Sequence, residues 1–250
     1  MSLTGKVVLV TGASSGIGRA IGLACARAGA DVAVSYRSNG SGAESVAGEI
    51  RAMGRRAEVF QTDVSREEDI AALAQGARTR FGRVDIWINN AGADILTGTG
   101  GQLSRLEKLD LLLAVDLRGT ILASWAAVDL MREQGGGVIL NMSWDHVAFG
   151  MKGENPILYS AAKGGIMSFS KSLAREVAPD IRVNILAPGF IDTAFGQEAG
   201  SAWRREVESR TPLARWGVPE DVAGAAVYLA SEQAAFLTGQ MLLVNGGVVM

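Results

Sequence analysis

The chain has 250 residues, of which 48% are hydrophobic and 20% charged, and its formal net charge is −2. This length suits one large α/β domain, and charges of both signs are interspersed, so nucleic acid and anionic membranes are not expected partners. The single cysteine, Cys25, excludes an internal disulfide, and with only one histidine, His146, a zinc site of Cys and His ligands is excluded too. We therefore expect no metal.

The amino terminus shows no signal-peptide pattern, and no apolar run reaches the ~20 residues of a membrane span. We accordingly expect a cytoplasmic protein.

Short runs rich in Val and Ile alternate with longer stretches of helical periodicity. Strands that are apolar on both faces are typical of a parallel sheet covered by helices on both sides. The pattern predicts an α/β, single-domain, doubly wound Rossmann fold over residues 1–250, with a mostly parallel seven-stranded sheet. In chain order we expect a strand at 6–11, a helix at 16–28, a strand at 31–36, a helix at 42–53, a strand at 57–61, a helix at 66–81, a strand at 84–88, a long helix at about 103–131, a strand at 137–142, a helix at 158–177, a strand at 181–187, a helix at 219–230 and a strand at 240–244.

The first expected strand runs into Thr-Gly-Ala-Ser-Ser-Gly-Ile-Gly at residues 11–18. A glycine-rich turn between a strand and a helix is the context of a dinucleotide site, because the helix N-terminus offers free N–H groups to phosphates. Gly12 permits the tight turn, Gly16 lets the backbone approach the pyrophosphate, and Gly18 lets the helix pack close to the sheet. The predicted phosphate contacts are Gly12, Ser14, Ser15, Gly16, Ile17 and Gly18.

The spacing TGxxxGxG resembles the short-chain dehydrogenase/reductase (SDR) family. Three further segments carry the resemblance in chain order: Asn-Asn-Ala-Gly at 89–92, Tyr-Ser-Ala-Ala-Lys at 159–163 and Pro-Gly at 188–189. It covers essentially the whole chain, is closest to 3-oxoacyl-[acyl-carrier-protein] reductases and glucose dehydrogenases, and implies a nicotinamide-dependent oxidoreductase of a small carbonyl or alcohol that forms a homotetramer. The resemblance also implies cofactor contacts at Asp63, Val64, Asn90, Ala91, Gly92, Pro188, Gly189, Ile191 and Thr193.

The residues after the second strand bear on the choice of cofactor. An acidic residue there would bind the ribose 2′-OH of NAD, whereas an arginine accommodates the 2′-phosphate of NADP. The sequence has no acidic residue at this point, and Arg37 and Ser38 can both hydrogen-bond a phosphate. NADP(H) is therefore the preferred cofactor, with NAD(H) as the alternative because Ser15 stands where many NADP-binding relatives carry a basic residue.

Tyr159 and Lys163 lie four residues apart, on one face of an expected helix. Reduction of a carbonyl needs a proton donor at the developing alkoxide, but free tyrosine titrates near pH ~10. A neighbouring ammonium stabilises the phenolate and lowers that pKa. We predict that Tyr159 is the general acid and base, and that Lys163 tunes it and binds the cofactor ribose.

The segment after the fifth strand departs from the family pattern. Relatives often carry Asn-x-Ser-Ser there with the second Ser catalytic, but Trp144 holds that position, in a segment about two residues longer than usual. Ser143 is the hydroxyl left on this strand end, and Asp145 and His146 are polar alternatives for the hydrogen bond to substrate. The predicted substrate contacts are Ser143, Trp144, Asp145, His146 and Phe195, and Ser143 is also a catalytic candidate.

A second departure is Asp116, which replaces the family's Asn in the expected long helix. Asp keeps the shape and an acceptor but loses the amide donor. A negative charge near Lys163 would oppose the lowering of the Tyr159 pKa. We count Asp116 among the catalytic candidates and expect it to change the pH optimum.

Residues 190–215 follow the sixth strand and are either a substrate lid or a segment that packs on the domain. The altered Ser and Asn positions favour a nucleotide-binding sensor or scaffold with weakened catalysis, whereas the intact Tyr159 and Lys163 favour an active NADP(H)-dependent reductase or dehydrogenase. We adopt the enzyme. An epimerase or dehydratase of the extended relatives is disfavoured because the sequence holds no sizeable C-terminal substrate domain.

Overall fold

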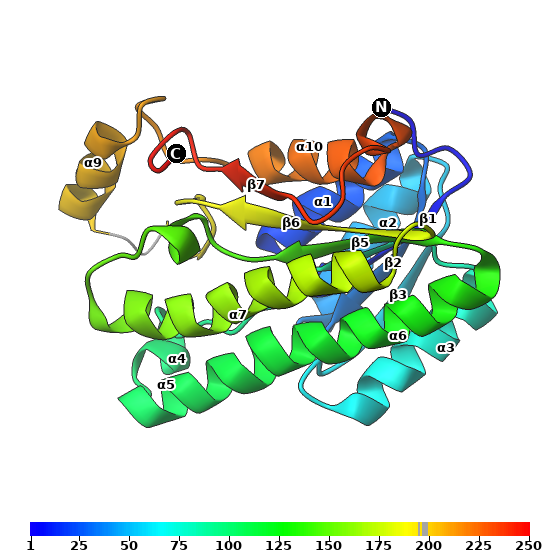
Figure 1. The fold of residues 1–250 in the computed structure, drawn as a ribbon, viewed down its shortest axis with the longest axis horizontal. Helices are drawn as coiled ribbons and strands as arrows, with labels where there is room; N and C mark the ends of the chain where they lie inside the picture. The colour runs from blue at the N-terminus through cyan, green and yellow to red at the C-terminus, as the bar shows by residue number, and fades with distance from the viewer. Residues whose placement is uncertain (195, 197–199) are drawn as a thin grey trace.

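A seven-stranded, entirely parallel sheet runs through the computed structural model, which describes residues 1–194, 196 and 200–250 (Figure 1). The strand order is β3-β2-β1-β4-β5-β6-β7. This confirms the doubly wound Rossmann fold. The strands are β1 (Val7–Val10), β2 (Asp31–Tyr36), β3 (Ala57–Gln61), β4 (Ile86–Asn89), β5 (Gly137–Met142), β6 (Ile181–Pro188) and β7 (Met241–Val244).

Helices cover both faces of the sheet because successive strand residues bury their side chains on opposite sides. Val8 and Val10 of β1 belong to one hydrophobic core, and Val7 and Leu9 belong to the other. Figure 1 shows the two layers. The first core lies under α1 (Gly16–Arg27), α2 (Gly40–Ala52) and α10 (Pro219–Ala230), and the second under α3 (Glu67–Phe81), α6 (Gly119–Gln134) and α7 (Glu154–Glu176).

The long helix expected at 103–131 is divided. It consists of α5 (Arg105–Leu112), a π-helical turn η1 (Leu113–Arg118) and α6, and the short α4 (Gly98–Gly101) precedes it. By length and composition alone the stretch Arg105–Gln134 is apolar enough to cross a membrane, but half of its most apolar window is buried inside the domain. We therefore interpret this stretch as a core helix that packs on the sheet.

The segment 190–215 holds a helix that its weak periodicity did not reveal, α9 (Ser201–Arg210), beyond the carboxyl ends of β6 and β7 (Figure 1). Val207 is the one buried residue of α9, so the helix has no continuous apolar stripe. Two short 3₁₀ turns complete the described elements, η2 (Asp145–Ala148) and η3 (Glu232–Ala234).

A buried polar network ties β4 and β5 to their covering helices just below the carboxyl edge of the sheet. Asn89 Nδ2 donates to Asn141 Oδ1 at 2.8 Å and to Ser124 Oγ at 3.1 Å, and Asn141 Nδ2 donates to Ser170 Oγ at 2.9 Å. Trp87 Nε1 donates to Asn89 Oδ1 at 2.9 Å. Because these buried groups satisfy one another, the network fixes the strand ends that carry the site.

Candidate active site

The glycine turn after β1 lies against the loop after β4. Gly12 has a φ of +64°, and a Cβ added there would come within 2.9 Å of Ala91 Cα; one added at Gly18 would come within 2.2 Å of the Gly12 oxygen. β1 and β4 are neighbours whose following chains diverge to opposite sides, which is where open α/β sheets bind ligands. Both predicted cofactor segments therefore meet at this point.

Asn90 clamps these two loops together. Its Nδ2 donates to the carbonyls of Thr11 and Gly12 at 3.0 and 3.1 Å, while Thr11 Oγ1 accepts from the backbone N–H groups of Asn90 and Ala91, each at 3.0 Å. The Ser15 side chain precedes α1 but makes no capping hydrogen bond to it. The first turn of α1 is thus not capped by its own N-cap side chain, as a phosphate cradle requires, and the site fits a dinucleotide.

The opposite end of the predicted cofactor site carries positive charge. Arg37 is exposed after β2, and its carbonyl accepts from Gln61 Nε2 at 3.1 Å. Burial alone would raise the pKa of Asp63, but hydrogen bonds from Ser65 and the charge of Arg37 lower it below its usual value. On the other side, Thr193 lies close to the glycine turn, since a Cβ at Gly16 would be 3.6 Å from its Cγ2.

The remaining predicted cofactor residues border the same edge of the sheet. Val64 packs against the start of α6, where a Cβ on Gly119 would come within 2.9 Å of the Val64 oxygen. Pro188 ends β6 beside Val244, and Ile191 forms an isolated parallel bridge with Gly217. Ser14, Ile17, Ser38 and Gly92 lie in the segments that flank the glycine turn, β2 and β4.

Lys163 forms a buried ion pair with Asp116. Its Nζ lies 2.9 Å from Asp116 Oδ2 and 3.4 Å from the Met142 carbonyl, and it sits 5.7 Å from the centroid of the Tyr159 ring. The other Asp116 oxygen accepts from the Ala93 N–H at 2.7 Å. Asp116 is fully buried and belongs to the π-helical turn η1, a feature often found at functional sites.

This arrangement sets the protonation of Tyr159. Burial raises its pKa, the ammonium of Lys163 lowers it, and the carboxylates of Asp116 and Asp94 raise it again, so that the net direction is upward. Burial would lower the pKa of Lys163, but Asp116 holds it above its usual value, so Lys163 remains an ammonium at neutral pH. The ammonium of Lys163 therefore lowers the Tyr159 pKa, and the carboxylate of Asp116 cancels part of that lowering.

The hydroxyl of Ser143 is already hydrogen-bonded within the protein. Its Oγ donates to the backbone carbonyl of Lys163 at 2.8 Å, and the residue is buried. The Trp144 ring, in contrast, meets the Tyr159 ring edge-on at 5.8 Å and stacks on the His146 ring at 5.0 Å. The structure thus brings Trp144 into contact with both Tyr159 and His146 and anchors Ser143 to α7.

Asp145 and His146 form a hydrogen-bonded pair. His146 Nδ1 lies 2.7 Å from Asp145 Oδ1, and Asn245 Nδ2 donates to Asp145 Oδ2 at 3.2 Å. Burial raises the pKa of Asp145, although His146 and Asn245 act in the opposite direction. A Cβ at Gly189 would come within 2.9 Å of Asp145 Oδ2, so the predicted Pro-Gly turn lets the chain approach this carboxylate closely.

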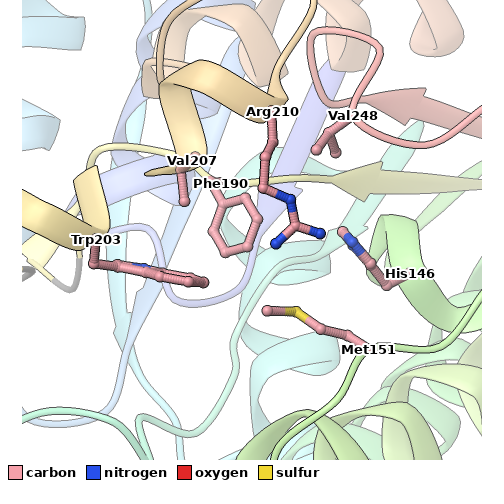
Figure 2. Close-up of a pocket in the computed structure, with 7 residues that line it drawn as sticks. All are labelled: His146, Met151, Phe190, Trp203, Val207, Arg210 and Val248. Atoms are coloured by element: carbon pink, nitrogen blue, oxygen red, sulfur yellow. The ribbon is translucent and has the colours of Figure 1, made fainter. Parts of the chain in front are cut away.

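His146 borders a narrow pocket that α9 closes from one side (Figure 2). Sequence reasoning missed the contributions of α9 because that helix lacks an apolar stripe. Phe195, a predicted substrate contact, lies outside the described residues. The pocket is lined by His146, Met151, Phe190, Trp203, Val207, Arg210 and Val248.

Comparison with known proteins adds relatives over the full length. A family model described as Enoyl-(Acyl carrier protein) reductase matches residues 12–249. The chain is 38% identical to a 3-oxoacyl-[acyl-carrier-protein] reductase of Synechocystis, covering 100% of this chain and 99% of the relative, and 36% identical to glucose 1-dehydrogenase 2 of Bacillus subtilis, covering 99% and 96%. The solved short-chain dehydrogenase/reductase of Serratia marcescens superposes with a TM-score of 0.90 at 33% identity, covering 99% of each chain.

Proposed function

The chain belongs to the short-chain dehydrogenase/reductase family of oxidoreductases, and on that premise we propose that it moves hydride between NADP(H) and a small carbonyl or alcohol. One observation carries the proposal: the buried ammonium of Lys163 lies 5.7 Å from the Tyr159 ring, at the same sheet edge as the glycine cradle. A proton donor and its tuning cation next to a dinucleotide site are the parts that carbonyl reduction needs.

The proton chemistry belongs to Tyr159. When bound, the nicotinamide supplies or accepts the hydride. In reduction the Tyr159 hydroxyl donates its proton to the substrate oxygen as negative charge develops there, and in oxidation the phenolate accepts the proton from the alcohol. Lys163 stabilises the phenolate, and Asp116 holds Lys163 in place through the ion pair of 2.9 Å.

His146 is the side chain that we assign to the substrate oxygen in place of the family serine. The Ser143 proton is committed to the Lys163 carbonyl, and Asp145 is fully buried behind His146. His146 keeps Nε2 free of the bond that Nδ1 makes to Asp145, and its ring lines the pocket. Trp144 contacts the rings of both His146 and Tyr159, and Phe195 remains a predicted contact.

NADP(H) is the cofactor that the proposal prefers, with NAD(H) used less well. Arg37 is exposed and its hydrogen bond with Gln61 is through its backbone carbonyl, so its guanidinium is available for a 2′-phosphate. Its charge already acts on Asp63 at the neighbouring strand end. Ser38 follows directly and can donate a further hydrogen bond.

The proposal also includes the setting of the enzyme. We place it in the cytoplasm as a homotetramer, as the family resemblance implies, with residues 190–215 covering the substrate. In support of the cover, α9 of this segment contributes Trp203, Val207 and Arg210 to the pocket. Light scattering on the purified protein measures the assembly.

The experiment that tests the function titrates NADPH and NADH by fluorescence and then follows oxidation of the bound cofactor against ketones, 3-oxoacyl thioesters and sugars. We expect turnover with NADPH, and Tyr159→Phe should lower kcat by about 10²- to 10⁴-fold while the Kd for NADPH stays within about twofold. Cofactor binding without any turnover would instead support the sensor or scaffold.

A further inference from the structure

The pocket beside the reacting centre combines two basic side chains with apolar walls. His146 and Arg210 border it together with five uncharged residues, and none of its lining residues in the described part of the chain is acidic. Figure 2 shows the guanidinium of Arg210 descending from α9 into the space among Phe190, His146 and Met151. A polar head placed in an otherwise apolar pocket is the arrangement that fixes the orientation of a ligand.

The partners of Arg210 leave most of its donors free. Among the described residues its one ion pair is with Glu206 of the same helix, at 3.5 Å, and the two side chains are 60% and 54% exposed. An exposed ion pair of this length contributes little to stability, so a ligand anion can replace Glu206 as the partner of Arg210. A guanidinium has five N–H donors in a planar fork, which matches a carboxylate in two parallel hydrogen bonds.

The pocket also connects to Tyr159 through side chains in direct contact. Trp144 touches both Tyr159 and His146, while Phe190 meets His146 edge-on at 6.1 Å and Trp203 at 5.7 Å. A substrate whose carbonyl lies at Tyr159 and His146 can therefore run along Trp144 and place its far end at Arg210. Glu206, the partner of Arg210, lies on the same helix and does not line the pocket, and the two oxygens of Asp145 are already bound by His146 and Asn245.

We propose that the substrate is an oxo acid or the corresponding hydroxy acid, whose carboxylate is bound by Arg210 in the pocket that His146 and Phe190 line. This inference rests on the proposed function, since it names the substrate class of the same site. Arg210 binds the carboxylate, the carbon chain lies along the Trp144 ring, and Tyr159 serves the carbonyl. Neutral ketones of the same length lose the interaction with Arg210.

The test uses methyl ketones that end in a carboxylate, from 3-oxobutanoate to 7-oxooctanoate, each paired with its methyl ester. With NADPH the wild-type protein should reduce at least one acid with a kcat/KM about 10- to 100-fold above that of its ester, the range for a hydrogen bond to a charged group. Arg210→Met should bring that ratio close to one, chiefly by lowering kcat/KM for the acid. Arg205→Met is the matched control, because Arg205 is exposed on the same helix and does not line the pocket.

A second readout separates this inference from the proposed function. Quenching of tryptophan fluorescence by the same acids and esters reports binding directly, because Trp203 lines the pocket. If the acids bind to the wild type but not to Arg210→Met, and no turnover is seen, the anion site is supported and the proposed oxidoreductase activity is rejected. Equal use of acids and esters, or an acid preference that survives Arg210→Met, overturns the anion site and leaves the oxidoreductase standing. If no acid or ester binds and none is turned over, the anion site is overturned as well.

Discussion

Replacement of Asp116 by Asn tests how the buried ion pair sets the working pH of Tyr159. The change removes one negative charge at a fully buried position and keeps the size of the side chain and an oxygen that can accept from the Ala93 N–H. Asp116 raises the pKa of Tyr159, whereas Lys163 lowers it. Removing the carboxylate should therefore lower the Tyr159 pKa, because the cation then acts without its counter-charge.

The size of this effect follows from the distances. Lys163 Nζ is 5.7 Å from the Tyr159 ring centroid and 2.9 Å from Asp116 Oδ2, so the carboxylate lies within about 9 Å of the ring. At an effective dielectric constant of about 20, two unit charges about 9 Å apart repel by about 2 kcal/mol. That energy corresponds to about 1.4 pH units in the Tyr159 pKa.

The assay is the pH dependence of kcat/KM for alcohol oxidation, which needs the phenolate and therefore rises with pH through the Tyr159 pKa. In Asp116→Asn this rise should move to lower pH by about 1 to 2 units, by the same Coulomb estimate. Asp110→Asn removes an exposed carboxylate from the preceding helix α5 and should leave the profile in place. An Asp116→Asn profile that coincides with the wild type refutes the reasoning.

Two further changes test the cofactor site. Arg37→Ala should lower kcat/KM for NADPH by about 10- to 100-fold, the range of a charge-assisted hydrogen bond, and leave NADH within about twofold; equal losses for both cofactors would contradict a 2′-phosphate contact. Gly18→Ala places a Cβ 2.2 Å from the Gly12 oxygen and should lower the free energy of unfolding in urea by about 1–3 kcal/mol. Gly48→Ala, in open space within α2, should instead stabilise the protein slightly, and similar effects of both alanines would show that close packing at Gly18 is not the cause.

The strands and most helices could be predicted because their signals are local. β2, β3 and β5 begin and end where the apolar runs do, and α10 occupies its expected range. The π-helical turn at 113–118 could not be predicted, because six residues are too few to show a period of their own between the two flanking α-helices. α9 was missed for a different reason, because an exposed helix with one buried residue has no amphipathic pattern.

The candidate site likewise has some features that the local sequence predicts and others that depend on long-range packing. The Tyr159–Lys163 spacing and the glycine turn are short patterns whose geometry follows from a helix and a tight turn. The direction of the Ser143 hydroxyl is not a local property, because its partner is the Lys163 carbonyl on α7. The bond from Asn245 to Asp145 joins residues 100 positions apart, and the pocket needs α9 in place. Contacts of this kind arise from the packing of whole elements, which no spacing in the sequence encodes.

The changes around Trp144 are consistent with one another, and this favours a modified active site over a lost one. An indole in place of a small hydroxyl removes a donor and fills space beside Tyr159, at 5.8 Å between the rings. The longer segment then forms the turn η2, which stacks His146 on Trp144 at 5.0 Å. A buried carboxylate is costly unless it is bound on all sides, and Asp145 is bound by both His146 and Asn245. A chain that had only lost the serine would gain nothing from maintaining that pair, so we interpret His146 as its functional replacement.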